Sequence, residues 1–476
     1  MDAQEIFARL SGDYNPLHLS QDVSRRLLFG ECVVHGIHLL LWALDQAASH
    51  ADGTRAITAL NVQFRSPVRL GREVALHFES REERWMLRVM AGNTLALLVR
   101  AELRPQLWTV TPVEDGPAPE LECRELDAAS FSVQEGGTLL RLSHAQTYGL
   151  FPNLLRIMPL DHVAILLATT RIVGMQCPGR HSLFSALALD FREGAPERTR
   201  IIRYRVECYD ARISQLILVV EEARAIGRLT AFERPRPRLQ AEMEDVRSVV
   251  SPRSFAGQRV LVVGGTRGLG EVAVKIFAAG GAEVFFTYYK NEATGAELAA
   301  NVSSAAGVDV RHAALDICRL EPNFTDILRR FSPTQLYYFA TPFIFQAEDG
   351  RFHPALFEKF NRYYLEGFNN CLLAVLERSA DGLVAFWPST TAIDELPGNM
   401  WEYAASKAAG EVLCHLLTAR HQRLQIVIER FPRLPTDQTA SVLPERHENP
   451  VPFIHRAALK TTSLWNSVFC EDKRNE

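Results

Sequence analysis

The sequence predicts an α+β region built from two similar segments, followed by an α/β region with a doubly wound parallel sheet. Two segments offset by about 127–130 residues show the same order of an apolar helix, a glycine-containing turn and strand-like runs. From residue 257 onward, short β-type runs alternate with helical stretches, which is typical of parallel sheets with crossover helices. Two irregular stretches, at 113–130 and 236–256, separate these parts.

The composition is that of an ordinary globular protein. The chain has 476 residues and a formal net charge of −4, and no dense run of Lys and Arg. We therefore expect neither nucleic acid nor a membrane as a partner. The eight cysteines show no paired spacing, so we expect no disulfide framework and no metal site. The N-terminus lacks a basic head followed by an apolar run, and we expect a cytoplasmic protein.

The irregular stretches divide the chain into three predicted domains. The first linker is acidic and contains Gly116, Pro117 and Pro119, while the second begins with alternating Arg and Pro. The predicted order is a first domain at 1–112, a linker at 113–130, a second domain at 131–235, a linker at 236–256 and a third domain at 257–476.

The first two domains read as a duplication. Residues 37–48 form an apolar helical stretch and residues 59–64 a strand, and residues 163–173 and 186–191 repeat this order. A long helix wrapped by a curved antiparallel sheet satisfies the pattern. We expect the two sheets to pair edge to edge, because pairing hides their unpaired strands.

The third domain contains six short β-type runs, at 259–263, 283–286, 308–315, 335–339, 382–387 and 424–429. Helical stretches separate most of them. Right-handed crossovers between such strands give a doubly wound parallel sheet.

A short polar motif near the N-terminus can add or remove water. In residues 11–18 (SGDYNPLH), Asp13 and His18 flank Asn15-Pro16. Proline disfavours helix for the residue before it, so a turn there can aim both side chains into one cleft. A carboxylate and an imidazole can together move the protons of a hydration. Gly36 follows His35 at the start of the apolar helix, where a backbone N–H can stabilise a developing enolate oxygen.

This motif, with VHG at 34–36 and FRSPVRLG at 64–71, resembles the MaoC-like (R)-specific enoyl-thioester hydratases of the hot-dog fold. The resemblance covers about residues 3–110, and it implies that Asp13 and His18 are the catalytic pair. The first strand that these enzymes often carry before the motif is missing here. In the second repeat, Asp161-His162 is the nearest constellation, but its spacing differs. We therefore expect residues 131–235 to be a degenerate hot-dog domain that supplies the partner sheet and part of an acyl tunnel.

The third domain opens with a glycine-rich turn that suits a dinucleotide. The strand at 260–263 leads into residues 264–270 (GGTRGLG), where glycines let a pyrophosphate sit on a helix N-terminus. Further along, Tyr403 and Lys407 lie four residues apart and therefore share one helix face. A neighbouring ammonium lowers the pKa of a tyrosine, which favours Tyr403 as a proton donor. Ser389 follows an apolar strand and can donate a hydrogen bond to a substrate carbonyl, with Thr390 as its rival.

These elements resemble the short-chain dehydrogenase/reductase family, with its Rossmann fold, and within it the β-ketoacyl thioester reductases. The resemblance covers residues 257 to about 440. It implies Tyr403 as the acid/base, Lys407 as the ligand of the nicotinamide ribose and Ser389 as the carbonyl donor. The expected cofactor-binding residues are Gly264, Thr266, Arg267, Gly268, Leu269, Gly270, Tyr288, Lys290, Asp316, Ala340 and Lys407.

The third domain departs from this family at two places. Where the family usually reads Asn-Asn-Ala-Gly, this chain has residues 338–341 (YFAT), with Phe339 at one asparagine position. Where a catalytic asparagine is expected in the next helix, Tyr364 stands, with Asn361 one turn earlier. We expect these changes to affect the proton relay that serves Lys407.

Charge predicts NADP(H) as the cofactor. An acidic residue directly after the second strand would hold the ribose hydroxyl of NAD, but here residues 287–290 (TYYK) follow that strand. Arg267 in the glycine turn can face a 2′-phosphate, although a solvated loop arginine is the alternative.

Together these signals predict a bifunctional enzyme acting on acyl thioesters of coenzyme A or a carrier protein. The third domain would reduce a 3-oxoacyl group to a 3-hydroxyacyl group, and the first would dehydrate it to the trans-2-enoyl form, in a biosynthetic direction. One alternative is a ketoreductase whose hot-dog part only binds acyl chains. Another is a non-enzymatic, NADPH-responsive scaffold in a larger synthase. We expect a homodimer or homotetramer.

Overall fold

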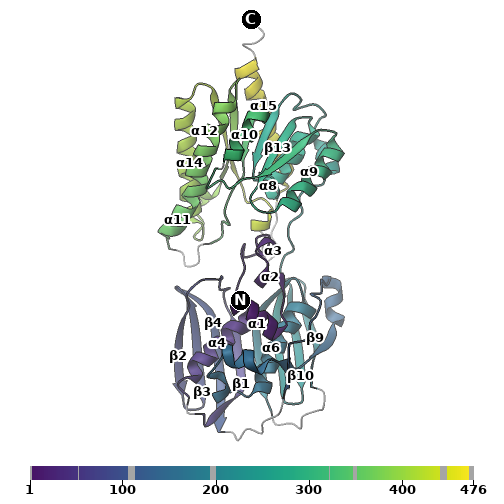
Figure 1. Ribbon diagram of the computed structural model, residues 1–476, viewed down its shortest axis with the longest axis vertical. Helices are drawn as coiled ribbons and strands as arrows, with labels where there is room; N and C mark the ends of the chain where they lie inside the picture. Colours follow the sequence, from purple (N-terminus) through teal and green to yellow (C-terminus); the bar gives the residue numbers. More distant parts are fainter. Residues whose placement is uncertain are drawn as a thin grey trace. The chain divides into compact units, whose positions relative to one another are not determined.

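The structure is a computed structural model that describes residues 3–51, 53–105, 113–192, 200–320, 322–346, 351–439 and 448–470 (Figure 1). The chain forms two compact units, and the boundary between them falls between Arg236 and Pro237. Each unit has its own hydrophobic core.

The first unit is built on one antiparallel sheet of nine strands in the order β2-β3-β4-β1-β8-β11-β10-β9-β6. The strands are β1 (Arg55–Phe64), β2 (Ala75–Arg81), β3 (Arg84–Ala91), β4 (Thr94–Pro105), β6 (Glu135–Leu139), β8 (Ser182–Phe191), β9 (Ile201–Asp210), β10 (Gln215–Glu222) and β11 (Ala225–Glu233). The order 2-3-4-1 of the first half is repeated in reverse by 8-11-10-9, which is the arrangement that a duplication produces.

The two halves meet where β1 pairs with β8. Leu60 lies opposite Leu189, and Val62 lies opposite Leu187, in antiparallel register. The predicted edge-to-edge pairing is therefore confirmed. It removes two exposed strand edges, which would otherwise be open to pairing with other chains.

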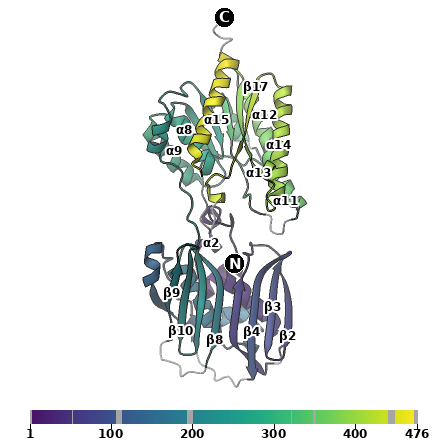
Figure 2. The ribbon, with the colours of Figure 1, turned by 180° about the vertical axis from the view of Figure 1, so that it is seen from behind.

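Two long helices cover one face of this sheet (Figures 1 and 2): α4 (Gly36–Ala48) and α6 (Leu160–Arg171). Both are rich in fully buried aliphatic residues, which join residues of both half-sheets in one core. Because a single core spans both halves, the second half is part of the scaffold of the first. A π-helical segment, Ile172–Gln176, extends α6.

The second unit contains a parallel sheet in the order β14-β13-β12-β15-β16-β17. Its strands are β12 (Arg259–Val263), β13 (Glu283–Tyr288), β14 (Val310–Ala314), β15 (Gln335–Tyr338), β16 (Leu383–Thr390) and β17 (Leu424–Phe431). All six predicted strands are present, and their order is that of the doubly wound dinucleotide-binding folds.

Helices cover both faces of this sheet. One core contains residues of α8 (Gly268–Ala279), α9 (Glu292–Ala306) and α15 (Pro450–Trp465). The other contains residues of α10 (Pro322–Phe331), α12 (Phe368–Arg378) and α14 (Trp401–Arg420). Such a sheet opens its ligand crevice at the carboxyl ends of the strands, where the order reverses between β12 and β15.

Shorter elements complete the described chain: α1 (Ala3–Ser11), α2 (Pro16–Leu19), α3 (Gln21–Ser24), β5 (Glu114–Asp115), β7 (Arg141–Leu142), α5 (His144–Leu150), α7 (Met243–Val249), α11 (Pro354–Asn361), α13 (Ala392–Glu395), two further π-helical segments (Arg362–Gly367 and Asn466–Cys470) and three 3-10 helices (Ala128–Val133, Leu154–Arg156 and Asp437–Thr439). One of them differs from expectation. The stretch 236–256 was expected to be a linker, but α7 lies within it, and Met243 and Val246 are buried in the core of the second unit. No helix in the described ranges has the length and hydropathy to span a membrane.

Candidate active sites

The N-terminal motif forms a tight turn between two helices. Gly12 ends α1 with a φ of +73°, a value that favours glycine. Asn15 then caps α2, because its side-chain oxygen accepts a hydrogen bond from the backbone N–H of Leu17 at 3.1 Å, and Pro16 occupies the first helical position. The cap is therefore Asn15, and the carboxylate of Asp13 stays directed into the interior.

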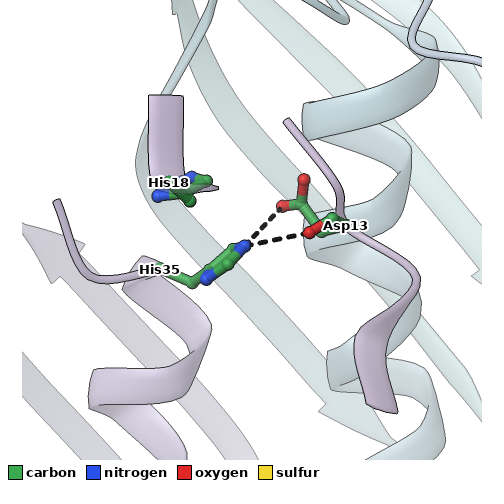
Figure 3. A group of neighbouring side chains, drawn as sticks. All are labelled: Asp13, His18 and His35. Carbon is green, nitrogen blue, oxygen red and sulfur yellow. Dashed lines mark hydrogen bonds and ion pairs between the residues drawn. The ribbon is translucent and has the colours of Figure 1, made fainter. Parts of the chain in front are cut away.

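Asp13, His18 and His35 come together in this turn (Figure 3). One ligand atom of each lies within 4.8 Å of the others. The Nδ1 atom of His18 lies 2.8 Å from the carbonyl oxygen of Val33. Since a carbonyl oxygen only accepts, Nδ1 carries the hydrogen, and the Nε2 of neutral His18 is left as a proton acceptor. The predicted catalytic pair is thus brought together, with His35 as a third member.

His35 ties the start of α4 to the turn. Its Nε2 donates to the backbone oxygen of Asp13 at 3.0 Å and lies 4.0 Å from Oδ2 of the same residue. Its ring stacks on that of His18, with 3.8 Å between the ring centroids. A carboxylate with two imidazoles is also a donor set that transition metals use. Here one nitrogen of each ring donates to a carbonyl oxygen, which fixes the orientation of both rings and leaves Nε2 of His18 as the proton acceptor.

Burial sets the proton affinities in this cluster. Removal from water raises the pKa of Asp13, while the neighbouring His18 and a hydrogen bond from Thr170 oppose this shift. Burial lowers the pKa of His18, and the carboxylate of Asp13 opposes that shift. The pKa of His35 is lowered further, by burial and by His18. Both members of the pair are thereby displaced toward neutrality, which suits a carboxyl and an imidazole that exchange protons.

Gly36 is the first residue of α4, as expected. A Cβ atom at this position would lie 2.9 Å from the ring of Phe64, so only glycine fits. The first N–H groups of a helix have no partner within the helix, and the helix dipole favours negative charge there. Gly36 can therefore supply the donor for an enolate oxygen.

The second half of the first unit also contacts this cluster. No sequence pattern indicates these contacts. Thr170, at the end of α6, donates from Oγ1 to Oδ2 of Asp13 at 2.7 Å. The carbonyl oxygen of Gly174 accepts from Nδ2 of Asn15 at 3.0 Å. Asp161 of the second repeat is instead buried in an ion pair with Arg224 at 2.9 Å.

A cavity of about 820 Å³ lies beside the turn that carries Asp13. It is lined by Arg9, Tyr14, Gly116, Pro117, Ala118, Glu120, Leu121, Ser143 and Gln146. Tyr14 is adjacent to Asp13 in the chain, and the lining from Gly116 to Leu121 belongs to the stretch expected as a linker. This volume is typical of pockets for small-molecule ligands.

In the second unit, the glycine turn has the shape that a dinucleotide needs. Gly264 and Gly268 have φ values of +83° and +57°. A Cβ atom on Gly270 would lie 2.0 Å from the carbonyl oxygen of Gly264, so the start of α8 packs directly on the turn. Thr266 lies in this turn, and Leu269 lies in the first turn of α8. Ala340, which follows β15, packs against Gly264, because a Cβ atom at Gly264 would lie 3.0 Å from the nitrogen of Ala340.

The residues after β13 and β14 complete the predicted cofactor set. Tyr288 ends β13 in a buried position, and Lys290 lies over the ring of Tyr289 at 5.0 Å. Asp316 follows β14 and accepts the backbone N–H of Cys318 at 2.9 Å, which fixes its side chain. These positions and Arg267 lie at or beyond the carboxyl ends of neighbouring strands, as the predicted binding mode requires.

Tyr403 and Lys407 share one face of α14, and the two candidate carbonyl donors, Ser389 and Thr390, have different partners there. The hydroxyl of Thr390 hydrogen-bonds to Tyr403. Ser389 Oγ instead donates to Oε1 of Glu411 at 2.5 Å, and Glu411 is paired with Arg430 at 2.6 Å. The geometry therefore favours Thr390 over Ser389, because the hydroxyl of Ser389 is held by the carboxylate of Glu411.

The expected electrostatic effect of Lys407 on Tyr403 is also different. Burial raises the pKa of Tyr403 to about 12, and the hydrogen bond from Thr390 opposes this shift. Burial lowers the pKa of Lys407 to about 7. The ammonium donates to the carbonyl oxygen of Pro388 at 2.7 Å. Desolvation outweighs the ammonium, so Tyr403 is a firmly protonated donor at neutral pH.

Tyr364 occupies the place of the expected asparagine and packs on Lys407. It lies in the π-helical segment 362–367, and its hydroxyl bonds to that of Thr341 at 2.5 Å. The Nζ atom of Lys407 is 4.3 Å from the centroid of the Tyr364 ring and 4.5 Å from that of Trp387. Asn361 accepts a hydrogen bond from the hydroxyl of Ser406 at 2.7 Å. An aromatic cage thus surrounds the ammonium.

Comparison with known proteins identifies both parts. Residues 2–96 match the family described as MaoC like domain, and residues 258–432 match short chain dehydrogenase. A 3-hydroxybutyryl-CoA dehydratase of Methylorubrum extorquens is 32% identical over 77 residues, which are 16% of this chain and 49% of the relative. The chain therefore spans about half the length of this curated relative.

Solved structures of short chain dehydrogenases resemble part of this chain. A short chain dehydrogenase from Shigella flexneri, complexed with NADP, is 19% identical, with a TM-score of 0.39, and covers 43% of this chain and 92% of its own. One from Burkholderia cenocepacia, also in complex with NADP, is 19% identical, with a TM-score of 0.38, and covers 44% and 91%. From the family matches, this chain joins a MaoC-like domain of the dehydratase/hydratase type to a short-chain dehydrogenase domain.

Proposed function

We propose that the protein is a bifunctional enzyme that reduces a 3-oxoacyl thioester with NADPH and dehydrates the resulting 3-hydroxyacyl thioester to the trans-2-enoyl form. The observation that supports this most directly is the presence of two complete sets of acid/base groups on one chain. One is the cluster of Asp13 and His18, and the other is Tyr403 with Thr390 and Lys407. Both reactions act at C3 of the same acyl group.

In the dehydration, the Asp13–His18 pair moves two protons. One goes from the pair to the departing 3-hydroxyl, which leaves as water, and the proton of C2 replaces it on the pair. A thioester carbonyl bound at the Gly36 N–H would carry the enolate charge between these events, where one aligned donor contributes about 10²–10³-fold. The shift of both groups toward neutrality supports this exchange, because neither end state is a strongly held ion.

In the reduction, bound NADPH supplies the hydride to C3. Thr390 and Tyr403 donate hydrogen bonds to the 3-oxo group, and Tyr403 delivers the proton that makes it a hydroxyl. Because burial raises the pKa of Tyr403 to about 12, this proton is available throughout the physiological range. Lys407, at the same helix face, would hold the nicotinamide ribose.

NADP(H) is supported by the charges around the glycine turn. The side chains that follow β13 are Tyr289 and Lys290, and no carboxylate stands there to repel a 2′-phosphate. Arg267 caps α8 and offers a planar guanidinium, which suits a phosphate. NADPH favours the reductive, biosynthetic direction. A carrier protein or coenzyme A would present the acyl group.

The sheet of the first unit supports a double hot-dog arrangement, with the catalytic half at 1–112 and the degenerate half at 131–235. The paired edges of β1 and β8 and the repeated strand order are what this arrangement requires. A homodimer or homotetramer in the cytoplasm completes the proposal.

Product analysis tests the proposal. 3-Oxoacyl thioesters of several lengths, on coenzyme A and on a carrier protein, are incubated with NADPH and followed by mass spectrometry. The wild type should yield 3-hydroxyacyl and enoyl products, and D13N should stop at the 3-hydroxyacyl form, with dehydration reduced at least about 10²-fold. Y403F should leave the 3-oxo group untouched but still hydrate crotonyl-CoA.

Other results would contradict it. Enoyl formation by D13N at the wild-type rate would remove Asp13 from the reaction. Reduction without any hydration, even of carrier-bound enoyl substrates, would favour a ketoreductase with an acyl-binding module.

A further inference from the structure

The carboxylate of Asp13 is held from both halves of the first unit. Its Oδ1 accepts the backbone N–H of Asn15 at 3.1 Å, a contact within the motif itself. Its Oδ2 accepts the hydroxyl of Thr170 at 2.7 Å, across 157 residues of sequence. Asp13 and Thr170 are both buried, so water does not compete for this hydrogen bond.

We propose that Thr170 is a positioning residue of the dehydration site, through which the second half fixes the catalytic carboxylate of Asp13. This inference rests on the proposed dehydratase function. It gives the half that lacks an Asp–His pair of its own a direct part in catalysis.

The neighbouring threonine shows that this contact is specific. Thr169 is equally buried, and its hydroxyl donates to the carbonyl oxygen of Leu166 at 2.7 Å, an ordinary choice for a threonine inside a helix. Thr170 directs its hydroxyl to Asp13 instead. Two adjacent residues of one type on one helix thus have different partners, and only one partner is the catalytic carboxylate.

The turn that follows α6 shapes the same contact. A Cβ atom at Gly174 would lie 2.3 Å from Oδ1 of Asp13, so the backbone there packs directly on the carboxylate. The carbonyl of Gly174 also binds Asn15, which supplies the other donor to Asp13. The end of α6 and the π-helical segment therefore pack closely against the carboxylate of Asp13, and Thr170 supplies the hydrogen bond to it.

Charged and titratable groups from several elements lie around Asp13. They are His18 from α2, His35 before α4, Arg171 from the end of α6 and Cys123 from the stretch before β6. The Thr170 hydrogen bond lowers the pKa of the Asp13 carboxyl, against the rise caused by burial. Loss of the hydroxyl should therefore raise this pKa, while the charges around it stay in place.

Three variants test the proposal. T170V keeps the shape and removes the hydroxyl, T170S keeps the hydroxyl, and T169V is the matched control on the same helix. For hydration of crotonyl-CoA, we expect T170V to lose about 10- to 100-fold in kcat/KM. Its acidic limb in the pH profile should move to higher pH. T170S should keep kcat/KM and the acidic limb close to those of the wild type, and T169V should leave the acidic limb in place.

A second measurement separates this inference from the proposed function. With ¹³C-labelled aspartate, the carboxyl signal that D13N removes reports the pKa of Asp13 without any substrate. T170V should raise that pKa relative to the wild type and to T169V, even if the enzyme acts on no thioester tested. An unchanged pKa in T170V, or an unchanged rate and profile in a chain that does hydrate crotonyl-CoA, would overturn the positioning role.

Discussion

Adjacent hydroxyl residues at the end of β16 have different partners, and this contrast decides their roles. Thr390 faces Tyr403, whereas Ser389 belongs to a network with Glu411 and Arg430. The sequence could place both residues after an apolar strand, but it could not choose between them. Both partners lie on α14, and only the packing of that helix against β16 shows which hydroxyl meets the phenol.

Replacement of each hydroxyl should therefore have unequal effects. T390A should lower kcat/KM for reduction of a 3-oxoacyl thioester by about 10²–10³-fold, as loss of one aligned donor to a reacting carbonyl does. S389A should cost less than about tenfold, because Glu411 keeps its ion pair with Arg430. Rates of NADPH oxidation measure both. If S389A were the more damaging change, the carbonyl donor would be Ser389 after all.

Lys407 gives the reduction a predicted pH dependence. Because burial lowers its pKa to about 7, the side chain loses its positive charge as the pH rises through that value. Reduction that needs the cation should thus be fastest below about pH 7 and fall above it, by up to about tenfold per pH unit. Tyr403, with its pKa raised to about 12, does not lose its proton in this range.

A cation that cannot titrate provides the control. K407R should be slower, since a guanidinium does not replace an ammonium in shape, but its falling limb should disappear between pH 6 and 9. Initial rates of NADPH oxidation over this range measure both profiles. A wild-type rate that stays constant up to pH 9 would mean that the charge of Lys407 is not required.

At the scale of helices and strands, the sequence predicted regular elements well and irregular ones poorly. The six strands of the second unit and the paired halves of the first follow from apolar periodicity, which reports burial of a whole face. The π-helical segments at 172–176 and 362–367 have no such signal, yet they place Gly174 against Asp13 and Tyr364 against Lys407. These two π-helical segments therefore lie beside proposed catalytic groups, as is frequent in proteins.

Contacts between distant segments explain the remaining differences. Asp13 and His18 could be paired from a spacing of five residues, but the partner of Asp13 on α6 lies 157 residues away. No local pattern marks Thr170 among the threonines of the chain. For the same reason, the charge and proline content of residues 236–256 predicts a linker, although Val246 packs in the core of the second unit.

Across the whole molecule, the two proposed sites are made from different compact units. The residues around Asp13 all precede the boundary at Arg236, and those around Tyr403 all follow it. A change in one site should thus leave the chemistry of the other intact. The covalent link keeps each site at a high local concentration near the site whose product it uses.

An equal mixture of D13N and Y403F tests this consequence. D13N can reduce the 3-oxoacyl thioester and Y403F can dehydrate the 3-hydroxyacyl product, so the mixture should form the enoyl product that neither variant forms alone. Because the intermediate must leave one chain and find another, the mixture should show a lag that lengthens on dilution. The wild type should show a shorter lag, since each chain that releases the intermediate also carries the site that consumes it. Absorbance of the enoyl thioester follows both time courses. Equal lags at every dilution would show that the fusion gives no kinetic advantage, and a mixture without enoyl product would show that the two activities cannot be separated between chains.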